Sequence, residues 1–420
     1  MNQPEESRLK TILFSVLAVG IGCVLLVVLA ELTVRYLDTQ QQERSHENPM
    51  GAIFRANPEG TGSFRLKENY AAMAELEGHT ISVELNSHGM HWREVALEKP
   101  AGRQRIAFVG DSFTFGQWAT TYEESFVGVF ASLADPNAFE VLNFGVPAYG
   151  FPDMELQIEE QVLSFDPDFV VIVMFTGNDF QDTYLGLEKN TIVEDGRLGI
   201  DQDLMLEKLP REVIPMNRLM GLEDASEPAT GSEPFSLREA LSNLALLQRA
   251  RATMDSWTSD EEDLFFDSLN VQHETFFWST YFSRKQYSPL AEAAKEDVLA
   301  SLARIEEILS ARGIQLMIAS VPFKDQVYAD VPETDTYDVA LPQTHVGNFA
   351  AAHSIPYYDT LPFLRDYVRS TDPDVFFQSD GHFNDLGYRI VGEELFRWFE
   401  ATVGAGSTTA GERIPVSIEE

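Results

Sequence analysis

The sequence predicts an α/β fold in which a parallel sheet of five strands is covered by helices on both faces. Five apolar runs of strand length recur along the chain, at 103–110, 140–145, 168–177, 314–322 and 355–360. Between them lie segments whose apolar residues recur at three- and four-residue spacing, and a last such segment covers 386–398. Strands that alternate with helices are typical of a parallel sheet buried on both sides.

The first element is a run of twenty uncharged, mostly apolar residues at 11–30. A helix of that length covers about 30 Å, the thickness of the hydrocarbon core of a bilayer. We expect a single-pass signal anchor, with residues 1–10 in the cytoplasm and the α/β domain outside it, which in a Gram-negative cell means the periplasm. The alternative is a signal peptide cleaved before Glu31, but its apolar run usually has only about 7–15 residues.

Composition excludes several kinds of site and partner. The chain has 30 Lys and Arg against 67 Asp and Glu, a formal net charge of -37, which disfavours binding to nucleic acids or to anionic membrane surfaces. Cys23 is the only cysteine, so intramolecular disulfides and cysteine-ligated zinc are excluded. We expect neither a metal nor another cofactor.

The pattern divides the chain beyond the anchor into four parts. Residues 31–79 form a stalk and lead-in, and the α/β domain covers 80–400, opening with an alternating strand at 81–85. An insertion at about 185–290 is far longer than one crossover requires, and Ser236 followed by Glu239 predicts a capped helix inside it. We expect a disordered tail at 401–420.

Three of the predicted strands end in short polar motifs. The first runs into Gly110-Asp111-Ser112, the second ends at Asn143-Phe144-Gly145, and the third at Gly177-Asn178-Asp179. Parallel strands bring their carboxyl ends to one edge, where such folds bind ligands. Ser112 is therefore a candidate nucleophile, with the Gly145 N–H and the Asn178 amide as candidate oxyanion donors. Taken singly, each could instead be a cap or turn residue.

The candidate base is His382, in the loop between the last strand and the last helix. Of the eight histidines, it alone follows the last strand with a carboxylate, Asp380, beside it. Serine needs such a base because its hydroxyl is a poor nucleophile at neutral pH.

Four motifs follow one another over roughly 105–400: Gly-Asp-Ser, a glycine, Gly-Asn-Asp and a late Asp/His pair. In this order they resemble the motifs of the SGNH or GDSL-type hydrolases. That resemblance implies a flavodoxin-like three-layer α/β/α sandwich with Ser112 as nucleophile, His382 as base, and Ser112, Gly145 and Asn178 as oxyanion donors. The family usually has Asp three residues before His, but position 379 is Ser. Asp380, Asp374 or a backbone carbonyl could orient His382.

Three functions follow as hypotheses: an esterase that deacylates an envelope or exported carbohydrate or lipid, an O-acyltransferase for an envelope polysaccharide, and a catalytically silent, membrane-tethered binding module. We expect Asp111 and Asp179 to support loops rather than to bind a cation. Three aromatic residues after the nucleophile could line a pocket or pack in the core, namely Phe113, Phe115 and Trp118.

The anchor hypothesis can be tested by cell fractionation. The full-length protein should sediment with membranes, whereas a variant without residues 1–30 should stay soluble, because the run of membrane length has been removed. A soluble mature protein that begins at Glu31 would contradict the anchor and favour signal-peptide cleavage.

Overall fold

The computed structural model describes residues 52–57, 64–186, 191–194, 197–200, 282–287, 289–328, 338–371 and 373–407. All of them belong to one compact unit, Pro49–Met216 with His273–Glu420. The anchor predicted at 11–30 and the capped helix predicted from Ser236 lie outside these residues. Within the described ranges, no helix has the length and apolarity needed to cross a membrane.

A parallel sheet of five strands forms the centre of the domain. Its order is β11-β10-β7-β5-β6, which in chain order is the 2-1-3-4-5 arrangement of flavodoxin-like folds, so the predicted fold class is confirmed. Apolar residues occupy both faces of the middle strands, and every residue of β7 is buried. The strands are β5 (Gln104–Gly110), β6 (Phe139–Asn143), β7 (Phe169–Phe175), β10 (Gln315–Val321) and β11 (Tyr357–Asp359).

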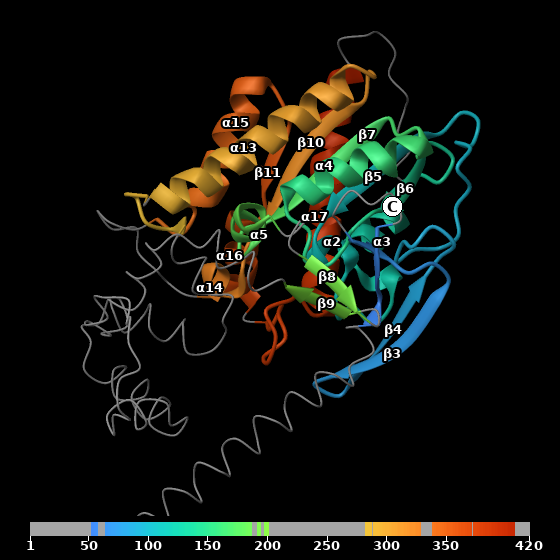
Figure 1. Ribbon diagram of the computed structural model, residues 1–420, viewed down its shortest axis with the longest axis horizontal. Helices are drawn as coiled ribbons and strands as arrows, with labels where there is room; N and C mark the ends of the chain where they lie inside the picture. The colour runs from blue at the N-terminus through green and yellow to red at the C-terminus, as the bar shows by residue number, and fades with distance from the viewer. Residues whose placement is uncertain are drawn as a thin grey trace, which may run out of the picture. The chain divides into compact units, whose positions relative to one another are not determined.

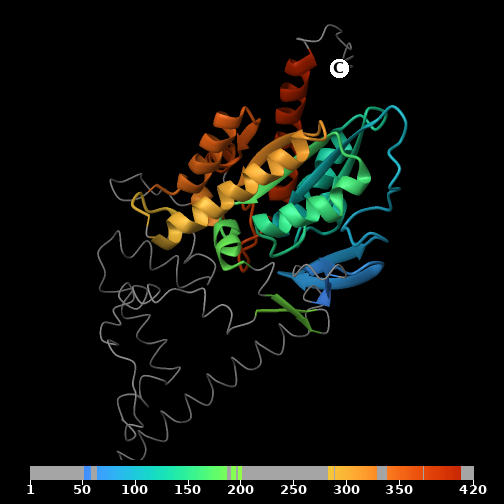
Figure 2. The same ribbon diagram turned by 45° about the horizontal axis from the view of Figure 1, so that its top comes forward.

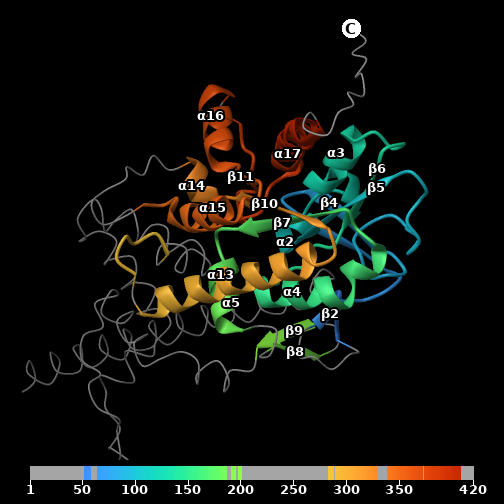
Figure 3. The ribbon, with the colours of Figure 1, turned by 90° about the horizontal axis from the view of Figure 1, so that it is seen from above.

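Helices cover both faces of this sheet (Figures 1 and 2). Figure 3 shows α4 (Phe151–Glu160), α5 (Asp179–Leu185) and α13 (Pro289–Ser310) on one side, and α3 (Phe126–Leu133), α16 (Leu361–Thr371) and α17 (Asp385–Ser407) on the other. The helix α17 continues to Ser407, beyond the predicted boundary at 400. The shorter elements are α2 (Ser112–Phe115), α14 (Lys324–Tyr328), α15 (Leu341–His353), and the 3₁₀ turns η2 (Tyr122–Glu124) and η3 (Val162–Phe165).

Three antiparallel strand pairs lie outside the central sheet, each as a separate two-stranded sheet. β1 (Phe54–Ala56) pairs with β2 (Phe64–Leu66), and β3 (Tyr70–Leu76) forms a hairpin with β4 (His79–Leu85), which contains the strand predicted at 81–85. The segment predicted as stalk and lead-in therefore contains strands, and the side chains of Phe54 and Phe64 are buried. β8 (Thr191–Glu194) and β9 (Arg197–Ile200) form a hairpin at the start of the predicted insertion. The region 201–281 lies outside the described residues.

Arg105, at the start of β5, links the sheet to the 96–98 segment that precedes it. Its side chain is fully buried, and its Nε donates to Glu140 Oε2 at 2.5 Å. Its Nη atoms donate to four backbone carbonyls, those of Ala96, Leu97, Glu98 and Phe165. A buried guanidinium is tolerated only because its donors are satisfied in this way.

Replacing Arg105 with Met should lower the free energy of unfolding by about 3–5 kcal/mol, because it leaves Glu140 and four carbonyls without their donor. The matched control is Arg389→Met, which removes an exposed arginine paired with Glu393 on α17 and should cost only about 0–1 kcal/mol. Denaturant unfolding measures both, and equal losses would contradict the anchoring role of Arg105.

Candidate active site

Ser112 lies at the carboxyl end of β5, at the point where the chain order of the strands reverses. It is the first residue of α2, and Asp111 caps that helix by accepting from the Phe113 N–H at 2.9 Å. Gly116 ends the helix after one turn with a φ of 82°, a conformation that glycine adopts without strain. The chain therefore presents Ser112 on a short, tightly closed turn at the edge where ligands bind in such folds.

The structure brings Ser112, His382 and Asp380 together. The Ser112 Oγ is 2.8 Å from His382 Nε2, shorter than its 3.3 Å to Asp111 Oδ2. On the other side of the ring, His382 Nδ1 is 2.5 Å from Asp380 Oδ1, which also accepts from the His382 backbone N–H. Asp374 is exposed, and its backbone carbonyl accepts from Asn384 instead. Of the orienting groups left open by the sequence, the structure places Asp380 at Nδ1.

Trp118 donates a hydrogen bond to Asp380, a contact that the sequence does not predict. The indole Nε1 donates to the second carboxylate oxygen of Asp380 at 3.0 Å. Burial alone raises the pKa of Asp380, but the charge of His382 and the hydrogen bonds from His382 and Trp118 outweigh it and lower the pKa to about 2. Asp380 is therefore a carboxylate at neutral pH, as an acceptor for Nδ1–H must be.

The other two aromatic residues after the nucleophile pack in the core. Phe113 stacks on Phe175 with ring centroids 4.1 Å apart, and its ring is 4.8 Å from that of His382. Phe115 stacks on the buried His91, whose Nδ1 bonds to the Phe115 carbonyl. Phe113 therefore forms an apolar floor beneath the imidazole.

The loops that carry the serine and the histidine are bound directly to each other. Asp385, at the start of α17, accepts from both the N–H and the hydroxyl of Thr120, at 2.9 and 2.6 Å. The Tyr388 hydroxyl donates to the Gln117 carbonyl at 2.8 Å. These bonds fix the start of α17 against the segment that follows Ser112.

The β3–β4 hairpin also contacts both loops. At its tip, Glu77 accepts from the N–H and hydroxyl of Ser379, one residue before Asp380, at 2.5 and 2.7 Å. Along β4, the Ser82 N–H donates to the Thr120 carbonyl at 2.9 Å. Part of the predicted lead-in is therefore built into the surroundings of the site.

The three candidate oxyanion donors differ in their present partners. The Ser112 N–H lies in the first turn of α2, where a helix provides no acceptor of its own. Asn178 is the residue before α5, in the capping position, but its side chain makes no capping bond, and its Oδ1 is buried without a partner in the described part of the chain. The Asn178 side chain therefore does not cap the helix.

Gly145 has a packing reason to be glycine. A Cβ there would lie 2.0 Å from Phe115 N, so only glycine allows this close approach to α2. Its N–H already donates to Asn143 Oδ1 at 2.9 Å. The Gly145 N–H thus already has a protein acceptor, and the Ser112 N–H likewise has one in the Asp111 carboxylate.

Three buried aspartates, Asp111, Asp179 and Asp182, influence one another's charge beneath this edge of the sheet. Burial raises the pKa of Asp111 to about 6, against the lowering effect of the Phe113 N–H and of His382. Burial, with repulsion from Asp111, also raises the pKa values of Asp179 and Asp182. Asp179 accepts from the Phe175 N–H at 2.8 Å and so supports the loop. Among the residues the structure describes, no group of side chains is placed to hold a metal ion.

Comparisons with known proteins bear on the carboxyl-terminal part most directly. Residues 276–412 match the family model for the SGNH hydrolase-like domain of the acetyltransferase AlgX. This range contains Asp380 and His382, whereas Ser112, Gly145 and Asn178 precede it. Among curated proteins, none matches the sequence.

Solved structures show a remote likeness. A catalytic mutant of the acetylxylan esterase Axe2 from Geobacillus stearothermophilus is 12% identical, with a TM-score of 0.38, 72% of this chain covered and 94% of that one. A two-domain esterase active on acetylated mannans is 13% identical, with a TM-score of 0.37, 76% of this chain covered and 54% of that one. Likeness at this level says nothing about substrate.

The matched region supplies β10 and β11 to the sheet that β5, β6 and β7 complete, and it also contains α17. Its Asp380 and His382 meet the serine that follows β5. Residues 276–412 therefore match the model of an SGNH hydrolase-like domain, and they share one sheet with the strand that Ser112 follows.

Proposed function

We propose that this protein is an esterase that uses Ser112 as its nucleophile and removes acyl groups from an ester in the cell envelope or on an exported carbohydrate or lipid. The observation that carries the proposal is the chain of hydrogen bonds from Ser112 Oγ through the His382 ring to Asp380. A nucleophile, a base and a group that orients the base are the parts that acyl transfer by serine requires.

In the proposed reaction, Ser112 Oγ attacks the ester carbonyl carbon while its proton passes to His382 Nε2. The negative charge that forms on the carbonyl oxygen is stabilised by the Ser112 N–H and the Asn178 side-chain amide. The Gly145 N–H already donates to Asn143 Oδ1, so it can stabilise the oxyanion only by donating to both oxygens. When the intermediate collapses, the leaving alcohol takes the proton from His382, and an acyl group remains on Ser112.

The second half of the reaction decides between two functions. If water attacks the acyl-Ser112 ester, the protein is an esterase, whereas attack by a sugar hydroxyl makes it an O-acyltransferase. The match of residues 276–412 to an acetyltransferase's domain favours keeping the second candidate. A silent binding module is the weakest candidate, because the serine and histidine are within hydrogen-bonding distance.

The purified protein should release acetate from an activated acetyl ester, and Ser112→Ala should abolish this while leaving the melting temperature unchanged. Adding neutral sugars as acceptors and measuring acetate and acetylated sugar together separates the two functions. Acetate alone supports the esterase, and acetylated sugar formed at the expense of acetate supports the transferase. Full activity in Ser112→Ala would contradict both.

Replacing Asp380 with Asn should lower kcat by about two to four powers of ten with little change in KM, because the imidazole loses the carboxylate that holds its tautomer. Steady-state kinetics with the activated ester measures the loss. Asp374→Asn is the matched control, since its exposed side chain does not contact His382, and it should leave kcat unchanged.

Trp118→Phe deletes only one of the bonds that Asp380 accepts and should give a smaller loss of kcat than Asp380→Asn. Equal and small effects of Asp380→Asn and Asp374→Asn would show that Ser112 and His382 act without a carboxylate.

A further inference from the structure

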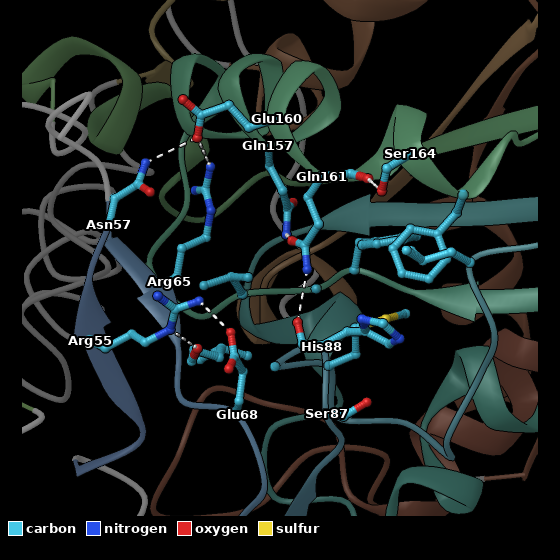
Figure 4. Close-up of a pocket in the computed structure, with 18 residues that line it drawn as sticks. Arg55, Asn57, Arg65, Glu68, Ser87, His88, Gln157, Glu160, Gln161 and Ser164 are labelled. Carbon is cyan, nitrogen blue, oxygen red and sulfur yellow. Dashed lines mark hydrogen bonds and ion pairs between the residues drawn. The ribbon is translucent and has the colours of Figure 1, made fainter. Parts of the chain in front are cut away.

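A second candidate ligand site lies between the N-terminal strands and helix α4. It is a pocket of about 220 Å³. Its lining comes from β1, β2, the 87–90 segment, the 144–146 segment and the end of α4 with η3 (Figure 4). None of the three residues of the hydrogen-bonded relay, Ser112, His382 and Asp380, is among those that line it. At this size it is smaller than the roughly 300–1,000 Å³ typical of sites for drug-sized ligands, and suits a single small ring.

The charges that line the pocket cancel one another. Arg65 is paired with Glu160, whose Oε2 also accepts from Asn57 Nδ2 at 3.0 Å. Arg55 is paired with Glu68 at 2.9 Å. Because each guanidinium already faces a carboxylate, the pocket offers no uncompensated positive charge to an anion. The remaining carboxylate lone pairs can accept from neutral donors.

Gln157 supplies a buried acceptor that has no partner among the residues the structure describes. Its side chain extends from α4 into the pocket (Figure 4) and is 2% exposed, and its Oε1 makes no hydrogen bond within the described residues. Its Nε2 is 3.5 Å from Gln161 Oε1, and Gln161 Nε2 in turn donates to the His88 carbonyl. Exchanging O and N of the Gln157 amide would set two acceptors against each other, so the open position is an acceptor. A buried acceptor without a donor is unfavourable, and a ligand hydroxyl would satisfy it.

Apolar side chains complete the pocket. Leu66, Met90, Phe144 and Phe165 line it and are almost fully buried. Paired carboxylates and an amide acceptor beside such a surface match a sugar ring, which has hydroxyl donors at its rim and C–H groups on its faces. An anionic ligand would be repelled by the carboxylates, and a purely apolar ligand would leave the acceptors without donors.

The pocket shares a wall with the candidate active site. Gly145 and Val146 line it, and Gly145 packs so closely on α2 that a Cβ would lie 2.4 Å from the Thr114 carbonyl carbon. We propose that this pocket binds an uncharged sugar residue of the glycan that carries the acyl group. The proposal rests on the proposed function for its link to catalysis. Contacts made at such a remote position contribute to kcat/KM only for substrates long enough to reach them.

Binding is measured by calorimetry on the full-length Ser112→Ala protein, which cannot turn over substrate. The probes are neutral pentasaccharides of the xylan, mannan and glucan series, with a uronic-acid pentasaccharide for comparison. At least one neutral pentasaccharide should bind, and adding Gln157→Leu should weaken its Kd by about ten-fold or more, as expected for the loss of a buried hydrogen bond. In the otherwise unchanged protein, Gln157→Leu should leave turnover of the small activated ester as it was.

Gln343→Leu is the matched control. It removes another buried glutamine, on α15, which does not line the pocket, so it should leave saccharide binding unchanged even if it lowers the melting temperature. The proposal is overturned if no neutral pentasaccharide binds, if the uronic-acid pentasaccharide binds more tightly, or if Gln157→Leu binds as well as the parent. If a neutral pentasaccharide binds as expected but the protein with an intact Ser112 does not turn over the activated ester, only the proposed function is contradicted.

Discussion

The hydrogen bonds on the two sides of the His382 ring determine whether this domain can carry out acyl transfer. Ser112 and His382 are far apart in the chain, so their 2.8 Å contact depends on how two loops are held together. Thr120 with Asp385, Gln117 with Tyr388 and Trp118 with Asp380 all join those loops. The β3–β4 hairpin adds a further attachment through Glu77 and Ser379. The loops and the hairpin therefore determine the distance between Ser112 and His382, while the sheet determines where Ser112 lies.

The buried aspartates beneath Ser112 give the site its electrostatic character. Asp111, whose pKa burial raises to about 6, interacts with His382, and Asp179 and Asp182 stand in the same mutually repelling group. In the proposed reaction, Asp111 lies near the positive charge that forms on His382 when Ser112 gives up its proton, and the carboxylate form of Asp111 stabilises that charge.

The sheet and the order of the site residues could be predicted because both produce local patterns in the sequence. Buried strands are continuous apolar runs, and each polar motif follows directly from a strand end. β1 and β2 have three residues each, too few for an alternating pattern to be recognised. Trp118 could be recognised as a pocket or core candidate, but its bond to Asp380 could not be predicted, because it joins residues more than two hundred positions apart and Trp118 has a φ of 69°. Likewise, the bond from Gly145 N–H to Asn143 could not be foreseen, because glycine after a strand is equally typical of an open turn.

The central claim is that Ser112, activated by His382, is the group that becomes acylated. Treatment with a fluorophosphonate probe, followed by peptide mass spectrometry, tests this directly, because the probe reacts with a serine that a neighbouring base has activated. The structure predicts one labelled peptide, with the adduct on Ser112, and no labelling of the His382→Ala protein. An adduct on a different residue, or undiminished labelling after Ser112→Ala, would contradict the account.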